Sequence, residues 1–161
     1  MKQITLYVYQ SIDGCQASSD KYFDAAVDAS GCVLIDEETD LRIYMNHLGW
    51  PITAKETLVV TNNAINLTEN ERVQFITGDV VAEQQRIKEN GDGTVVAYGE
   101  EIGTLLLDNG LADEITVTTI PILVGGDEKV LKCGLSDGGI WIVRSNKMLV
   151  DGKMRTVYGK V

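Results

Sequence analysis

Two carboxylate side chains in the first 20 residues stand where they could give or take a proton. Asp13 lies in the segment Ser11-Ile12-Asp13-Gly14, directly after the first expected strand, and Asp20 opens the first expected helix. A carboxyl group with a raised pKa can supply a proton to a reacting nitrogen. The same positions suit structural roles, because Asp before Gly closes turns and Asp near a helix start caps the helix. Catalysis and local structure therefore both remain open for these residues.

Metal chemistry has no comparable support. The three cysteines, Cys15, Cys32 and Cys133, lie far apart and lack metal-ligand spacing, and His47 is the one histidine. This set cannot build a zinc site of the usual kind. Cys32 falls in an apolar strand and is expected in the core. Cys15 falls in a loop, where either packing or thiol reactivity is possible.

The elements that must position these residues follow from hydrophobic periodicity. Apolar residues at helical spacing predict helices over residues 20–29, 37–48, 79–89 and 100–109. Alternating or continuous apolar runs predict strands over residues 4–9, 32–35, 57–61, 73–76, 94–97, 114–122, 139–150 and 153–160. Asp151-Gly152 predicts a tight turn between the last two strands.

This order of elements indicates the fold class. Strands that alternate with helices require right-handed crossovers and a mostly parallel sheet, and the terminal hairpin adds antiparallel strands at one side. The chain has no internal repeat, low-complexity tract or linker, so residues 1–161 are expected to form one α/β domain with three αβα layers.

Composition narrows the functional classes. The net charge is −10, and no basic stripe interrupts it, so we expect no nucleic-acid partner. No apolar run reaches membrane-spanning length, and the start of the chain has no signal-peptide core. We therefore expect a cytoplasmic protein that does not bind membranes.

Residues 94–126 carry the most specific pattern in the sequence. A buried strand leads into Gly99, a leucine-rich helix, Gly110-Leu111-Ala112-Asp113-Glu114, a further strand and Pro121-Ile122-Leu123-Val124-Gly125-Gly126. With the Ser11-Ile12-Asp13-Gly14 start and Trp50-Pro51, this order resembles the dihydrofolate-reductase-like superfamily. The resemblance is to the reductase domain of riboflavin biosynthesis (the RibD C-terminal domain) and its stand-alone bacterial relatives, and it covers essentially the whole chain.

The resemblance implies an NAD(P)H-dependent reductase of a pteridine-like or ribosylamino-pyrimidine-like substrate, acting as a homodimer. In such proteins the cofactor is held at the carboxyl ends of the strands and at helix N-termini. The resemblance places three segments at the cofactor: the one that follows the second strand, the one that follows the 94–97 strand, and the last glycine loop. The implied cofactor-binding residues are Asp36, Glu37, Tyr98, Gly99, Glu100, Gly125 and Gly126. Asp20 and Asp13 are placed on the substrate side.

The sequence departs from the family pattern at two of these sites. Asp36-Glu37 stands where the family has Gly-Arg, and only Gly99 remains of its glycine turn. Like charges about 4 Å apart repel by roughly 1 to 4 kcal/mol, so a carboxylate beside a cofactor phosphate weakens binding. Glu37 could instead accept hydrogen bonds from a free ribose 2′-hydroxyl and select NADH over NADPH.

Two further hypotheses stay open beside the reductase. The first is a non-catalytic relative with a degenerate cofactor site, which binds another small molecule or a protein partner. The second is a flavin or nucleotide binder in which Tyr98 stacks on an aromatic ring.

Overall fold

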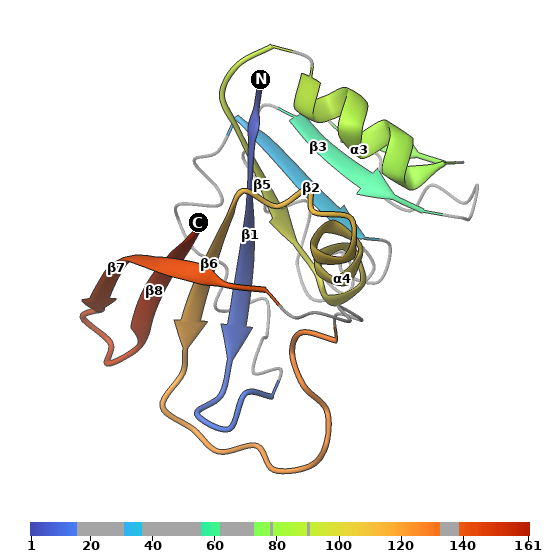
Figure 1. Ribbon diagram of the computed structural model, residues 1–161. Helices are drawn as coiled ribbons and strands as arrows, with labels where there is room; N and C mark the ends of the chain where they lie inside the picture. The colour runs from blue at the N-terminus through green and yellow to red at the C-terminus, as the bar shows by residue number, and fades with distance from the viewer. Residues whose placement is uncertain (16–30, 37–55, 62–72, 78, 90, 133–138) are drawn as a thin grey trace.

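The computed structural model describes residues 1–15, 31–36, 56–61, 73–77, 79–89, 91–132 and 139–161 (Figure 1). The predicted helices over 20–29 and 37–48 lie outside these ranges. The described strands are β1 (Gln3–Gln10), β2 (Cys32–Asp36), β3 (Glu56–Val60), β4 (Val73–Ile76), β5 (Thr94–Tyr98), β6 (Glu114–Thr119), β7 (Trp141–Met148) and β8 (Met154–Lys160). The described helices are α3 (Val80–Glu89) and α4 (Glu100–Asp108).

The strands form one mixed sheet in the order β4-β3-β2-β5-β1-β6-β8-β7. The six strands from β4 to β6 pair in parallel, whereas β8 runs antiparallel to both β6 and β7. The predicted fold class, a mostly parallel α/β sheet with a terminal antiparallel hairpin, is confirmed. Parallel pairing brings the carboxyl ends of β1, β2, β3, β5 and β6 to one edge of the sheet, as Figure 1 shows.

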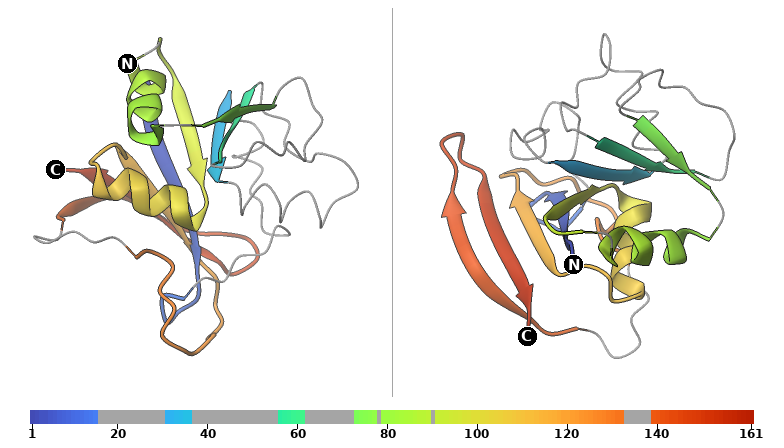
Figure 2. Two further views of the ribbon diagram at one scale, coloured as in Figure 1. Left: turned by 90° about the vertical axis from the view of Figure 1, so that its right-hand side faces the viewer. Right: turned by 90° about the horizontal axis from the view of Figure 1, so that it is seen from above.

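The central strands are buried on both faces. All five residues of β2 are buried, and so are the last four of β5, which matches their continuous apolar sequences. One face packs against α3 and α4, which lie on the same side of the sheet (Figure 2). On that side Ile4, Leu6 and Leu34 meet Ile102 and Leu106 of α4, all fully or almost fully buried.

Several strand ends differ from the sequence prediction. The strand predicted over 114–122 ends at Thr119, because Pro121 has no N–H and the Ile122 N–H turns back to the Ile120 carbonyl oxygen at 2.7 Å. The strand predicted over 139–150 covers only Trp141–Met148. The predicted turn is confirmed: Gly152 has φ +85°, and the Leu149 N–H bonds the Lys153 carbonyl oxygen at 2.7 Å.

No helix within the described ranges combines the length and the apolar character needed to cross a lipid bilayer.

Candidate functional site

The described residues among those predicted for the site lie at the carboxyl edge of the sheet. Asp36 is the last residue of β2, Tyr98 is the last residue of β5, and Gly99 precedes α4. Asp13 follows β1, and Gly125-Gly126 follow β6. In open parallel sheets this edge is where ligands bind, since loops and helix N-termini meet there.

Helix α4 begins without a cap of its own. Gly99 is its N-cap residue and has φ +138° and ψ +150°, a backbone conformation open essentially to glycine alone. A glycine has no side chain to accept the N–H bonds of the first turn. Those donors must therefore find an acceptor elsewhere in the fold.

Asp36 supplies that acceptor from the neighbouring strand. Its Oδ2 accepts hydrogen bonds from the backbone N–H of Glu101 at 3.1 Å and of Ile102 at 3.2 Å. Only 4% of Asp36 is exposed, so its carboxylate lies at the helix start in a site largely shielded from water. Asp36 was predicted as a cofactor-binding residue, and in the structure its carboxylate contacts α4.

Glu100, also predicted to bind cofactor, pairs with a lysine from a later loop. Its Oε1 lies 2.9 Å from Lys132 Nζ, and Lys132 also lies 3.3 Å from an oxygen of Glu128. These two carboxylates raise the pKa of the lysine, chiefly through the hydrogen bond to Glu100. The ion pair ties the segment after the glycine loop to the start of α4.

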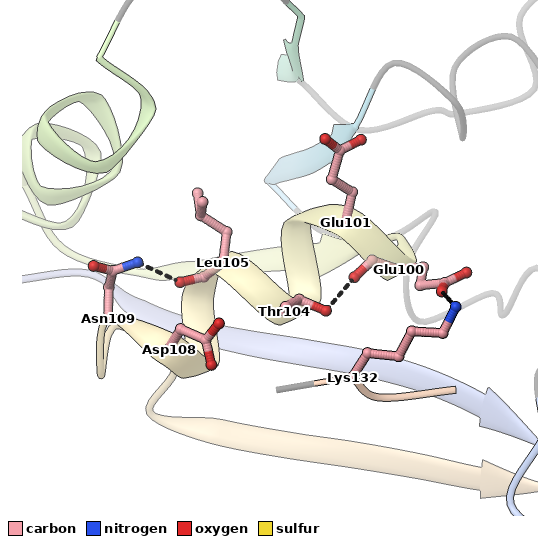
Figure 3. Close-up of a pocket in the computed structure, with 7 residues that line it drawn as sticks. All are labelled: Glu100, Glu101, Thr104, Leu105, Asp108, Asn109 and Lys132. Atoms are coloured by element: carbon pink, nitrogen blue, oxygen red, sulfur yellow. Dashed lines mark hydrogen bonds and ion pairs between the residues drawn. The ribbon is translucent and has the colours of Figure 1, made fainter. Parts of the chain in front are cut away.

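A hollow of about 470 Å³ lies along this side of α4 (Figure 3). In the figure Glu100 points to Lys132, whereas Glu101 leaves the helix on another side. The lining residues are Glu100, Glu101, Thr104, Leu105, Asp108, Asn109 and Lys132. The hollow runs down the outside of the helix and contains none of the other predicted site residues.

Asp13 joins the loop after β1 to the glycine loop after β6. Its Oδ2 accepts a hydrogen bond from the Gly125 N–H at 2.7 Å, and its Oδ1 accepts one from the Val124 N–H at 3.2 Å. The Ser11 hydroxyl donates a further, very short bond to Oδ1. These donors, Ser11 first, hold the pKa of the Asp13 carboxyl well below its ordinary value.

Cys15 packs into the same junction. Its Sγ lies 3.8 Å from the Gly125 carbonyl oxygen and 4.0 Å from that of Gly126, and only 4% of the residue is exposed. Burial and the neighbouring Asp13 carboxylate raise the pKa of the Cys15 thiol. This environment suits a packed side chain and opposes a reactive thiolate.

Tyr98 is buried in the opposite face of the sheet from α4. Its ring packs edge-to-face on that of Tyr9, with centroids 5.7 Å apart and planes at 82°, and 6% of Tyr98 is exposed. Tyr98 is therefore held as a core residue by β1.

The predicted residues thus form two groups. Asp13, Gly125 and Gly126 meet in one group, and Asp36, Gly99 and Glu100 meet at the start of α4. Asp20 and Glu37 lie outside the described residues. Within the described ranges no group of His, Cys, Asp and Glu side chains could hold a metal ion.

Three contributing residues were given no role from the sequence: Ser11, which was noted only as part of the Ser11-Ile12-Asp13-Gly14 motif, Tyr9 and Lys132. Ser11 is fully buried beside a turn aspartate, and a serine two residues before an aspartate in a turn is a signal that could have been used. The partners of Tyr9 and Lys132 are distant in sequence, and no local pattern identifies them.

Comparison with solved structures identifies the fold. A Shewanella sp. PV-4 protein assigned to riboflavin biosynthesis superposes with a TM-score of 0.82 at 18% identity, covering 99% of each chain. Dihydrofolate reductase from Enterococcus faecalis, in complex with NADP(H) and RAB-propyl, gives a TM-score of 0.68 at 14% identity, covering 98% of this chain and 95% of that one. The protein therefore has the dihydrofolate-reductase-like fold.

A longer protein shares the same fold over part of its length. Acinetobacter baumannii RibD matches with a TM-score of 0.70 at 15% identity, and the match covers all of this chain but 58% of that one. No protein-family model matches the sequence, and no curated protein matches it. Identities this low show a common fold and leave the chemistry to the site itself.

Proposed function

We propose that this protein is an NAD(P)H-dependent reductase of a pteridine-like or ribosylamino-pyrimidine-like ring, acting at the carboxyl edge of its sheet. The observation that carries the proposal is the full-length agreement with the fold of a reductase that holds NADP(H). The hydrogen bonds between Asp13 and the loop at Gly125 support it, since they hold two loops of this edge in a fixed relative position, as the orientation of a substrate requires.

Reduction of a C=N bond needs a hydride delivered to carbon and a proton delivered to nitrogen. The lowered pKa of the Asp13 carboxyl makes it a poor proton donor at neutral pH, so we assign Asp13 a positioning role. Asp20 remains the proposed proton donor. The cofactor supplies the hydride when bound, with the loop around Gly125-Gly126 proposed as part of its site.

A thermal-shift titration with NADPH, NADH and FMN tests the proposal. A ligand that binds only the native state stabilises it by about 2.7 kcal/mol at a hundred times its dissociation constant, which is visible as a shift of several degrees. We expect a shift with one of the two nicotinamide nucleotides. Oxidation of that nucleotide, followed at 340 nm with dihydropterin and pyrimidine substrates, should then be lost in Asp20→Asn while the thermal shift remains.

A second candidate is a non-catalytic member of the fold that binds another small molecule or a protein. The contact of Asp36 with α4 favours it, because a carboxylate there competes with a cofactor phosphate for the same N–H groups. No thermal shift and no oxidation with either nucleotide would reject the reductase and leave this candidate.

We also propose that the protein forms a homodimer through its terminal strands. β7 is the outermost strand of the sheet, and every one of its residues after Trp141 is exposed, including Ile142 and Val143. An exposed edge with apolar side chains favours association with another chain.

A further inference from the structure

The start of α4 combines three features that bear on what this edge of the sheet can bind. It has no cap of its own, because Gly99 carries no side chain. It lies at the carboxyl end of β5, the edge where parallel sheets receive ligands. Its N–H groups and helix dipole attract anions, phosphate above all.

The Asp36 carboxylate already occupies this position. One oxygen accepts bonds from both Glu101 and Ile102, at 3.1 and 3.2 Å, as a phosphate oxygen does at a helix N-terminus. With 4% of the residue exposed, water screens its charge less than it would at the surface. A ligand phosphate would have to displace the carboxylate or lie against it.

Neighbouring carboxylates also oppose the binding of a phosphate group at the start of α4. Glu100 and Glu101 add two carboxylates in the first turn of α4. Lys132, the cation paired with Glu100, is shared with Glu128 and so is already matched by two carboxylates. Among the described residues the carboxylates at the helix start therefore outnumber the ammonium group of Lys132, and this excess of negative charge opposes a second anion.

We infer that Asp36 is a specificity-determining residue: its carboxylate binds the N–H groups at the start of α4 that a ligand anion would otherwise bind. This edge of the sheet therefore selects ligands that place no phosphate group at α4. The ligand class is a neutral or cationic ring compound, or a nucleotide whose phosphates lie away from α4. The inference deepens the proposed function in locating the ligand at this edge, but it does not depend on whether the protein reduces anything.

Inorganic pyrophosphate is the probe for this inference, because it presents the phosphate group without a base or a nicotinamide. Its binding would be measured by isothermal titration calorimetry at constant ionic strength in the wild type, Asp36→Gly and Asp36→Asn. Asp36→Gly removes both the charge and the occupant of the helix start. Asp36→Asn removes the charge but keeps an oxygen that can accept the two N–H bonds.

We expect Asp36→Gly to bind pyrophosphate at least about tenfold more tightly than the wild type, and Asp36→Asn to gain less. Glu128→Gln is the matched control: it removes one carboxylate from the same region without touching the α4 amides, and it should stay within about twofold of the wild type. Equal binding by the wild type and Asp36→Gly would overturn the inference, as would an equal gain in Glu128→Gln.

Amide NMR spectra locate the effect and guard against a folding defect. Pyrophosphate should move the Glu101 and Ile102 amide signals in Asp36→Gly and leave them unmoved in the wild type. If Asp36→Gly does not fold, the same comparison is made with Asp36→Ala, which also leaves the two N–H groups without the carboxylate, and a lack of movement there rejects the inference. The nicotinamide titration of the wild type is separate, so failure of the reductase proposal does not affect this result.

Discussion

At the scale of single residues, Asp13 fixes the geometry of one part of the candidate site, the junction of the loops after β1 and β6. Its carboxylate collects bonds from Ser11, Val124 and Gly125, and it thereby joins two loops more than 100 residues apart in sequence. The same bonds lower its pKa, because each stabilises the charged form. The stability of the junction therefore depends on pH.

The direction of this pH dependence follows from the lowered pKa of the Asp13 carboxyl. The stabilisation by Asp13 is fully present above the unfolded-state pKa of about 4, and it is lost as the pH falls toward the folded-state pKa. We expect Asp13→Asn to unfold at lower urea concentration than the wild type at pH 5 to 7, and the difference to shrink below about pH 4. Urea unfolding at stepped pH measures this. Asp127→Asn, an exposed carboxylate in the same loop, is the control. A difference that stays constant down to pH 2 would contradict the assigned role.

The sequence alone predicted part of the candidate site. The turn at Asp13 and the glycine pair at 125-126 were both identified, and turn closure by Asp13 was one of the two roles considered. The contact of Asp36 with α4 was not predicted, because the bonded groups lie 65 and 66 residues apart. A glycine N-cap does signal that a helix needs an acceptor from elsewhere, but it does not identify which residue provides it.

At the scale of elements, the position of α4 depends on how closely it approaches β1. Gly103 is buried on the face of α4 that meets the sheet. A Cβ added there would lie 3.2 Å from one methyl carbon of Leu6 and 3.4 Å from the other, tighter than ordinary van der Waals contact. The glycine therefore lets the helix, and with it the N–H groups that Asp36 binds, lie close to the strand.

A larger side chain at this position should push the helix outward. We expect Gly103→Val to lower the free energy of unfolding by roughly 1 to 3 kcal/mol, the usual cost of overpacking a core. Gly103→Ala should change it little, since better helix propensity offsets the mild crowding. Urea unfolding measures both. Thr104→Val places the same side chain at the next, half-buried position and should cost less than about 1 kcal/mol. Wild-type stability in Gly103→Val would mean that α4 is not tightly held.

At the scale of the whole molecule, topology was more predictable than strand ends. Continuous apolar runs such as residues 32–35 and 95–97 are typical of central parallel strands, and together with the order of elements they predicted the mixed sheet. The ends of β6 and β7 depend on tertiary pairing and on Pro121, and their predicted lengths were too long. That residues 1–161 form one domain stays a proposal. It is supported by a single sheet that includes both Gln3 and Lys160.

The last prediction concerns β7, the strand at one edge of that sheet. Ile142 and Val143 are 44% and 56% exposed, and the alternation of side chains along β7 directs them to opposite faces of the sheet. A second chain that covers either face of β7 would therefore contact one of them. If a second chain covers either face of β7, at least one of the two charges would have to be buried on association, at a cost of several kcal/mol. We therefore expect the double variant Ile142→Lys/Val143→Lys to be a folded monomer in sedimentation velocity at micromolar concentration, where the wild type is a dimer. Ile12→Lys, at a 62% exposed residue outside the terminal strands, should remain a dimer. A monomeric wild type, or a double variant that still dimerises, would contradict the proposal that β7 forms the dimer interface.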